Sequence, residues 1–184
     1  MLRSSCAVLG FLALLAPVPP DVDAVAFAKA FQAGQADQYK NKQVSGSGVS
    51  FHGPIKERTA DGSTRTSIVV ILGAIGADGE LTPVKLWDEF VDSQRAERAG
   101  TTLVVALSGP NLPDVAAGPT ALTFTGVYDG QIRTIMRPPQ AGAGPGSAPC
   151  PGEQAREASE AGSFFCAPLL TGATATIASI GQAR

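Results

Sequence analysis

Two cysteines near the end of the chain are the first residues whose chemistry needs an interpretation. Cys150 and Cys166 enclose 15 residues in the stretch "APCPGEQAREASEAGSFFCAP". Such a pair can bind a metal, attack a substrate or form a disulfide, and an oxidising compartment favours the disulfide. A zinc site needs two further ligands, and the one histidine of the chain, His52, lies about a hundred residues away. The compartment therefore decides how the pair is interpreted.

The chain begins with the pattern of a secretory signal. Arg3 precedes an apolar run over residues 6–18, which a proline-rich stretch then ends. A run of roughly 13 residues is shorter than the ~20 that span a bilayer, so a retained anchor is the weaker alternative. Val22 and Ala24 suit signal peptidase, which predicts cleavage after Ala24 and a segment 1–24 outside the fold. We therefore expect a periplasmic or extracellular protein with a structural disulfide between the two cysteines.

Candidate catalytic and metal-binding groups are few. A Ser-His-Asp arrangement requires His52 as its base, and Ser47 in "VSGSGVS" lacks the glycine two residues earlier that a nucleophile elbow needs. Asp88, Glu89 and Asp92 offer carboxylates at the start of a predicted helix, without a loop to supply further ligands. The sequence therefore predicts no catalytic residues, no metal site and no cofactor.

Four residues are candidates for contact with a ligand or partner. His52 is predicted in a loop at a strand end, and Trp87 stands between a predicted strand and a predicted helix. Trp87 is either a core anchor or a ligand platform. Phe164 and Phe165 are adjacent, so on a strand one faces inward, next to the disulfide, and the other outward.

The first half of the chain predicts one helix and several strands. The spacing of Phe27, Ala30 and Phe31 predicts a short helix that Gly34 ends. The glycines of "KQVSGSGVSF" predict a bent strand, and "TRTSIVVILGAI" predicts a fully buried one. The turn "ADGE" and the following "LTPVKLW" predict a hairpin.

The second half predicts a helix over residues 88–99 and more strands. The charge order of "DEFVDSQRAERAG" suits a helix dipole. Strands follow in "TTLVVALSG", "TALTFTGVY" and "QIRTIMR", with "YDGQ" predicting a hairpin turn between the last two. Residues 138–149 are rich in proline and glycine and predict a linker or loop. A short helix between the cysteines and a strand at "FFCAPLL" are expected in the C-terminal segment, residues 150–184.

These elements predict a β-rich α+β fold. After the signal over residues 1–24, one globular domain covers residues 25–137, and the segment 150–184 packs on it. A helix after three strands resembles the order of the OB fold, a small closed or partly closed antiparallel barrel. A β-sandwich is the alternative.

The chain of 184 residues carries 14 basic and 16 acidic residues. Because it has no basic run, nothing in it favours nucleic acid or anionic lipid, and no later stretch is long enough to span a membrane. We expect a non-catalytic accessory subunit or interaction module that binds another exported protein. One alternative is a small-ligand carrier with an apolar cavity lined by Phe51, Trp87 and Phe124. The other is a small hydrolase that uses His52. The oligomeric state is not determined by the sequence.

Overall fold

The computed structural model describes residues 21–58, 62–76, 78–84, 101–115, 118–136 and 164–178. Strands dominate these residues, with one α-helix and one 3₁₀ helix, η1. In chain order the elements are β1 (Val22–Asp23), α1 (Ala24–Gln32), η1 (Ala36–Tyr39), β2 (Lys42–Ser50), β3 (Ile55–Arg58), β4 (Thr64–Ile75), β5 (Leu81–Thr82), β6 (Thr101–Ser108), β7 (Thr120–Met136) and β8 (Phe164–Ile177).

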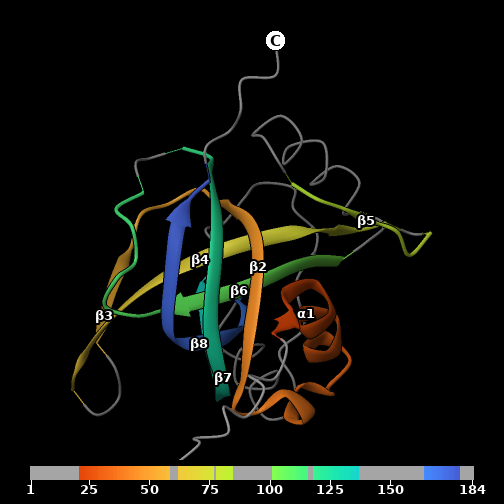
Figure 1. Cartoon of the computed structure of the whole chain (residues 1–184), viewed down its shortest axis with the longest axis horizontal. Coiled ribbons are helices and arrows are strands. Elements are labelled where there is room, and N and C mark those ends of the chain that lie inside the picture. Colours follow the sequence, from red (N-terminus) through yellow and green to blue (C-terminus); the bar gives the residue numbers. More distant parts are fainter. Residues whose placement is uncertain are drawn as a thin grey trace, which may run out of the picture.

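Five strands form a closed ring of hydrogen-bonded neighbours in the order β2, β7, β8, β6, β4, and β4 returns to β2 (Figure 1). Four of these strands have Greek-key order. In the chain they follow one another as β2, β4, β6 and β7, but in the sheet β7 lies beside β2, so the spatial order is β7, β2, β4, β6. β8 completes the ring, antiparallel to β7 and parallel to β6. The sheet is therefore mixed, which corrects the expected antiparallel arrangement, and the described strands belong to one sheet.

Alternate residues of the ring strands fill its interior. Their period of two turns one set of side chains inward from every strand, and these side chains are apolar and buried. The interior side chains include Val44, Ile68, Val70, Leu72, Leu103, Val105, Leu107, Leu122, Phe124, Tyr128, Leu170 and Ala173. A continuous apolar core thus joins the strands of the ring.

Helix α1 packs beside the ring and contributes to the same core (Figure 1). Phe27 and Phe31 are almost fully buried, which confirms the predicted helical face. Burial of each of these two phenylalanine side chains stabilises the fold by about 1.5–3 kcal/mol. The ring of Phe27 also contacts those of Tyr39 and Tyr128, with centroids 5.8 and 4.8 Å away. The helix ends just before Gly34, whose φ of +72° suits glycine.

Residues 22–24 belong to the fold. Val22 and Asp23 pair in parallel with Val44 and Ser45 of β2, and the Asp23 carboxylate accepts a hydrogen bond from the Ala26 N–H at 2.9 Å. Ala24 begins α1 and is buried. The prediction that the whole segment 1–24 stays outside the fold is therefore wrong for residues 22–24, because Asp23 caps the helix. Residues 1–20 lie outside the described part of the chain.

The predicted hairpin at "YDGQ" is wrong, because β7 continues through it as one strand. Asp129 and Gly130 form a bulge there: Gly130 has a φ of +96°, and the pairing with β8 shifts between Tyr128 and Ile132. The Asp129 carboxylate accepts hydrogen bonds from the backbone and side-chain N–H groups of Gln131. Both halves of β7 pair with β8, so the strand bends without reversing.

The hairpin predicted at "ADGE" is confirmed, but its second strand is short. β5 covers only Leu81 and Thr82, pairs with the end of β4, and is not one of the ring strands. The predicted third strand of the fold therefore lies outside the ring, and β6 is the third ring strand in chain order. The predicted helix 88–99, the linker 138–149 and the helix between the cysteines lie outside the described residues.

The ring closes where β2 crosses β4 at a glycine. Val49 pairs with Ile71, and next to it Gly48 lies so close to β4 that a side chain would not fit. A Cβ at position 48 would lie 2.5 Å from the Ile71 carbonyl oxygen and 2.6 Å from Cγ1 of Val70. Gly48 therefore serves a close approach of two backbones, whereas the sequence predicted only that the glycines bend the strand.

The substitution Gly48→Val is expected to lower the free energy of unfolding by about 1–3 kcal/mol or more, since the new side chain must push β2 away from β4. Denaturant unfolding measures this loss. Ser47→Val is the matched control, because Ser47 is exposed in the same strand and should change stability by only about 0.5 kcal/mol. Equal effects of the two substitutions would contradict the role given to Gly48.

Candidate functional site

An open polar cleft lies where β3, β4 and β6 meet. Its volume is about 390 Å³, and it is lined by residues 63–66 at the start of β4 and residues 108–110 at the end of β6. Arg65 is the charged residue of this lining. Four of the other lining residues are serine or threonine.

The cleft follows from a mismatch in strand length. β3 pairs with residues 64–67 of β4, whereas β6 pairs with β4 only from Ser67, opposite Ser108, onward. Residues 64–66 thus have a strand on one side and no described strand on the other. Figure 1 shows that the arrow of β6 ends short of the start of β4, which lies beside β3. We call this three-residue stretch, Thr64–Arg65–Thr66, the ladder gap.

Residues 109–111 explain why β6 does not fill the ladder gap. Gly109 lies against β8, where a Cβ would overlap the carbonyl oxygen of Ala173. Pro110 lacks an N–H to donate to a neighbouring strand. Asn111 then bridges to Thr174 of β8. The chain therefore follows β8 and leaves β4 after Ser108.

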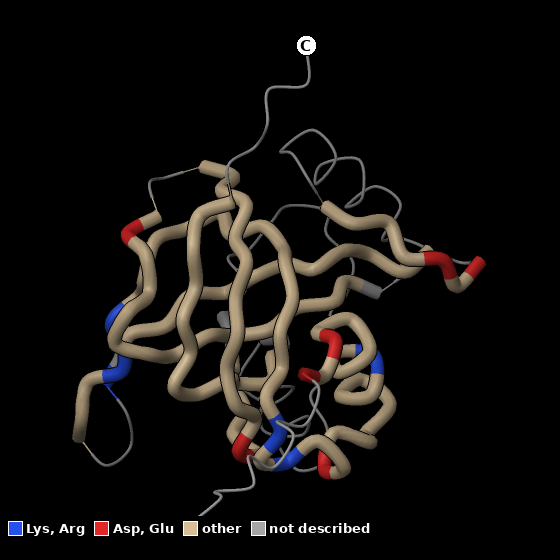
Figure 2. The backbone as a smooth tube through the Cα atoms, viewed as in Figure 1, with Lys and Arg blue, Asp and Glu red and all other residues tan. Residues whose placement is uncertain are grey.

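The cleft carries positive charge and spare hydrogen-bonding groups. Arg65 is half-buried, and its guanidinium makes no ion pair or hydrogen bond with the other residues that the structure describes. Ser67, two residues further on the same face, is fully buried, and its hydroxyl has no hydrogen-bond partner in the described part of the chain. Lys56 and Arg58 of β3 are exposed nearby, opposite Thr66 and Thr64. Figure 2 shows blue segments where β3 meets β4 and red ones beyond the far end of β4.

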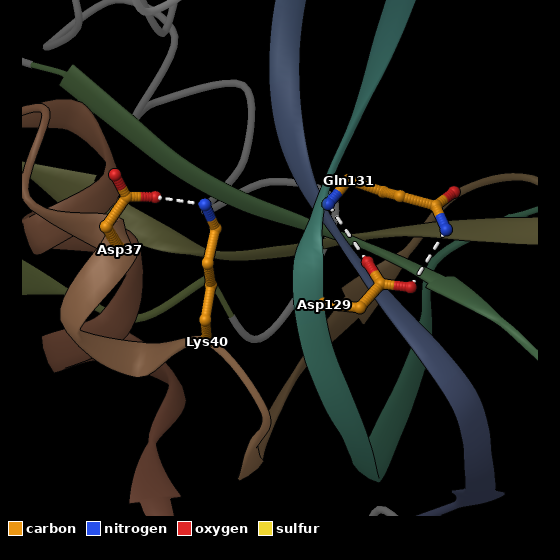
Figure 3. A network of polar contacts seen from close by, with 4 residues as sticks. All are labelled: Asp37, Lys40, Asp129 and Gln131. Atoms are coloured by element: carbon orange, nitrogen blue, oxygen red, sulfur yellow. Dashed lines mark hydrogen bonds and ion pairs between the residues drawn. The ribbon is translucent and has the colours of Figure 1, made fainter.

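A second polar group lies at another end of the ring, around η1 and the bulge of β7 (Figure 3). Lys40 and Asp37 form an exposed ion pair at 2.8 Å, and the hydrogen bond to Asp37 raises the pKa of Lys40. Burial, followed by the negative charge of Asp37, raises the pKa of Tyr128. Because Asp129 and Gln131 bond to each other within the bulge, this group stabilises local structure.

His52 lies away from any catalytic partner in the described residues. It is exposed just after β2, and its backbone carbonyl accepts a hydrogen bond from the Ser50 hydroxyl at 2.9 Å. No carboxylate or serine oxygen among the described residues is hydrogen-bonded to its imidazole. The condition that the hydrolase hypothesis requires is therefore not met there.

The other predicted site residues are only partly visible. Trp87 and Cys150 lie outside the described residues, so the Cys150–Cys166 disulfide stays a prediction. Phe164 and Phe165 begin β8 and pair with Met136 and Ile135. Their side chains are not described.

Cys166 is fully buried, and its sulfur lies 3.9 Å from the hydroxyl of Thr134. The expected cavity residue Phe124 is part of the buried core. Of the four predicted contact residues, His52 is the one whose side chain the structure describes, and Arg65 with its neighbours was not predicted from the sequence.

Comparisons with known proteins give no family. A scan against protein-family models and searches of curated proteins and of solved structures find no match to this chain. The described residues contain no group of three or more histidine, cysteine, aspartate or glutamate side chains that could hold a metal. Within the same residues, no helix has the length and apolar character that crossing a membrane requires.

The stability of the fold is expected to fall as the pH rises above about 10. Tyr128 keeps its proton in the folded state, because its pKa is raised, whereas the unfolded chain loses that proton from about pH 10 upward. The free energy of unfolding should decrease by up to about 1.4 kcal/mol per pH unit, until the pH exceeds the folded pKa. Tyr128→Phe should remove this decrease in denaturant unfolding, and Tyr39→Phe is the matched control. An unchanged pH profile in Tyr128→Phe would assign the decrease to other groups.

Proposed function

We propose that this protein is a non-catalytic interaction module of an exported complex, and that its binding surface is the cleft at the ladder gap. The proposal rests on three features that occur at one place: an open cleft, an arginine without a partner among the described residues, and a stretch of strand with no described neighbour on one side. A binding surface needs such unused groups, whereas a catalytic site needs a base or nucleophile held by a second polar group.

The topology of the ring supports the same surface. A five-stranded ring with Greek-key order is the arrangement of the OB fold, a partly open barrel that binds ligands on the face of its second and third strands. β4 and β6 are the second and third ring strands in chain order, and the cleft lies between their ends. We therefore propose an OB-like barrel whose binding face is in the position usual for that fold.

The two alternative functions have less support. A carrier of apolar ligands needs an apolar hollow, whereas the cleft is polar and Phe124 is one of the buried core residues. A hydrolase needs a partner for His52, and the described residues provide none by hydrogen bonding. The interaction module requires neither.

Export and the disulfide belong to the proposal as well. The signal-like residues at the start of the chain support export. Cys150 is the one other cysteine outside the first ten residues, which supports its pairing with Cys166. Because residues 22–24 cap and begin α1, we propose that any cleavage lies before Val22.

Photo-crosslinking tests the proposed surface. A photoreactive amino acid at Thr66, in the lining of the cleft, should crosslink one protein in the exported fraction of the native host. The same amino acid at Thr123, exposed on β7, is the matched control and should give at most a background level. Equal crosslinking from both positions, or crosslinking from Thr123 alone, would place the binding surface elsewhere.

The disulfide predicts the thiol content of the exported protein. The native protein should contain no titratable thiol, and reduction under denaturing conditions should release two if the N-terminal segment with Cys6 has been removed. Mass spectrometry of the same sample reports which residues remain. Two free thiols in the unreduced protein would contradict the disulfide.

A further inference from the structure

We infer that the ladder gap receives an extended peptide segment with acidic side chains, which adds to the sheet as a short strand beside β4. This inference rests on the proposed function and names the kind of partner that the cleft accepts. The sequence analysis expected a protein partner but assigned no residue of the cleft to it.

The backbone of the ladder gap gives the first argument. A strand that has a neighbour on one side only presents N–H and C=O groups on the other, and an extended peptide satisfies both kinds of group. The gap is three residues long, which corresponds to about 10 Å of strand. Because the space beside it is the cleft, an added strand has room there.

The side chains of the cleft give the second argument. Arg65 lines the cleft, and a guanidinium matches a carboxylate through two parallel hydrogen bonds. Ser67 lies on the same face of β4 and directly opposite Ser108, another residue of the lining. Its hydroxyl is buried beneath the cleft and has no hydrogen-bond partner among the described residues. On the face that carries Arg65, the guanidinium and the Ser108 hydroxyl in the lining are thus the donors for an acidic side chain.

The surrounding charges favour an acidic partner over a basic one. Lys56 and Arg58 are exposed on β3 beside the gap, and no described acidic side chain lines the cleft. Glu57, opposite Arg65, has a side chain that is not described. Asp78 and Glu80 follow β4 at its other end. An approaching acidic segment is therefore attracted to the end of β4 that carries the gap.

A peptide explains these features better than a simple anion or a nucleic acid. Acetate only accepts hydrogen bonds, and inorganic phosphate has one or two O–H donors at neutral pH, so neither provides the regular series of donors and acceptors with which a strand pairs the N–H and C=O groups of the gap. The near-neutral chain has no basic run of the kind that binds a phosphate backbone. An extended peptide brings donors, acceptors and carboxylates together.

The test is a titration of the isotope-labelled full-length protein with short peptides, followed by residue-resolved NMR. The probe is the capped hexapeptide Val-Glu-Val-Glu-Val-Glu. Its first control is Val-Lys-Val-Lys-Val-Lys, and its second is the acidic peptide with N-methyl groups on alternate residues, which removes backbone donors. Inorganic phosphate and acetate test a simple anion site.

The acidic peptide should shift the signals of Thr64, Arg65 and Thr66, and both control peptides should bind at least about tenfold more weakly. Arg65→Gln should weaken binding of the acidic peptide about tenfold, as expected for a lost charge-assisted hydrogen bond. Lys29 is exposed on α1, away from the cleft lining. Lys29→Gln removes one positive charge there and should leave the affinity unchanged. Folding of each variant is checked from its own spectrum.

Three results would overturn the inference. Equal affinity of the N-methylated peptide would exclude strand addition, and phosphate or acetate binding as tightly as the peptide would leave an anion site only. No shift with any probe in a folded protein would exclude the acidic segment. If crosslinking at Thr66 still captured a protein in that last case, the proposed function would stand and only the class of partner named here would fail.

Discussion

The fold depends on the close approach of β2 and β4 at Gly48. Without a side chain at that position, the two strands come near enough for Val49 to pair with Ile71, and the sheet closes on itself. Closure removes the free edges that an open sheet of this size would present. It also gives every ring strand an inner face, which the apolar side chains of the core fill.

The same closure determines where unpaired backbone remains. β4 is long enough to pair with β2, β3, β5 and β6 at different points along its length. β6 leaves it after Ser108, because Gly109 and Asn111 lie against β8. The ladder gap is therefore a consequence of the ring: the strand that would cover residues 64–66 is diverted to pair with β8.

The local elements could be predicted from the sequence, and the site could not. The spacing of Phe27 and Phe31 predicted α1, and the apolar run of β4 predicted a buried strand, because both patterns are local. The "YDGQ" stretch was misinterpreted because a turn signal does not distinguish a hairpin from a bulge when both flanking segments pair with the same strand. The cleft depends on which residue of β6 lies opposite Ser67, and register of this kind comes from contacts between distant segments. Arg65 and Ser67 carry no motif that marks them.

The central claim is that a structured ring carries one short stretch of unpaired backbone that a partner strand can fill. Residue-resolved amide hydrogen exchange tests it most directly, in the free protein and with the acidic hexapeptide. In the free protein, the amides of residues 64–66 that face the gap should exchange quickly, while those of Ile68–Leu72 are protected by pairing on β6 and in the core. The peptide should slow the exchange of the gap amides and leave the others unchanged. Gap amides as protected as those of Ile68–Leu72 in the free protein would contradict the account.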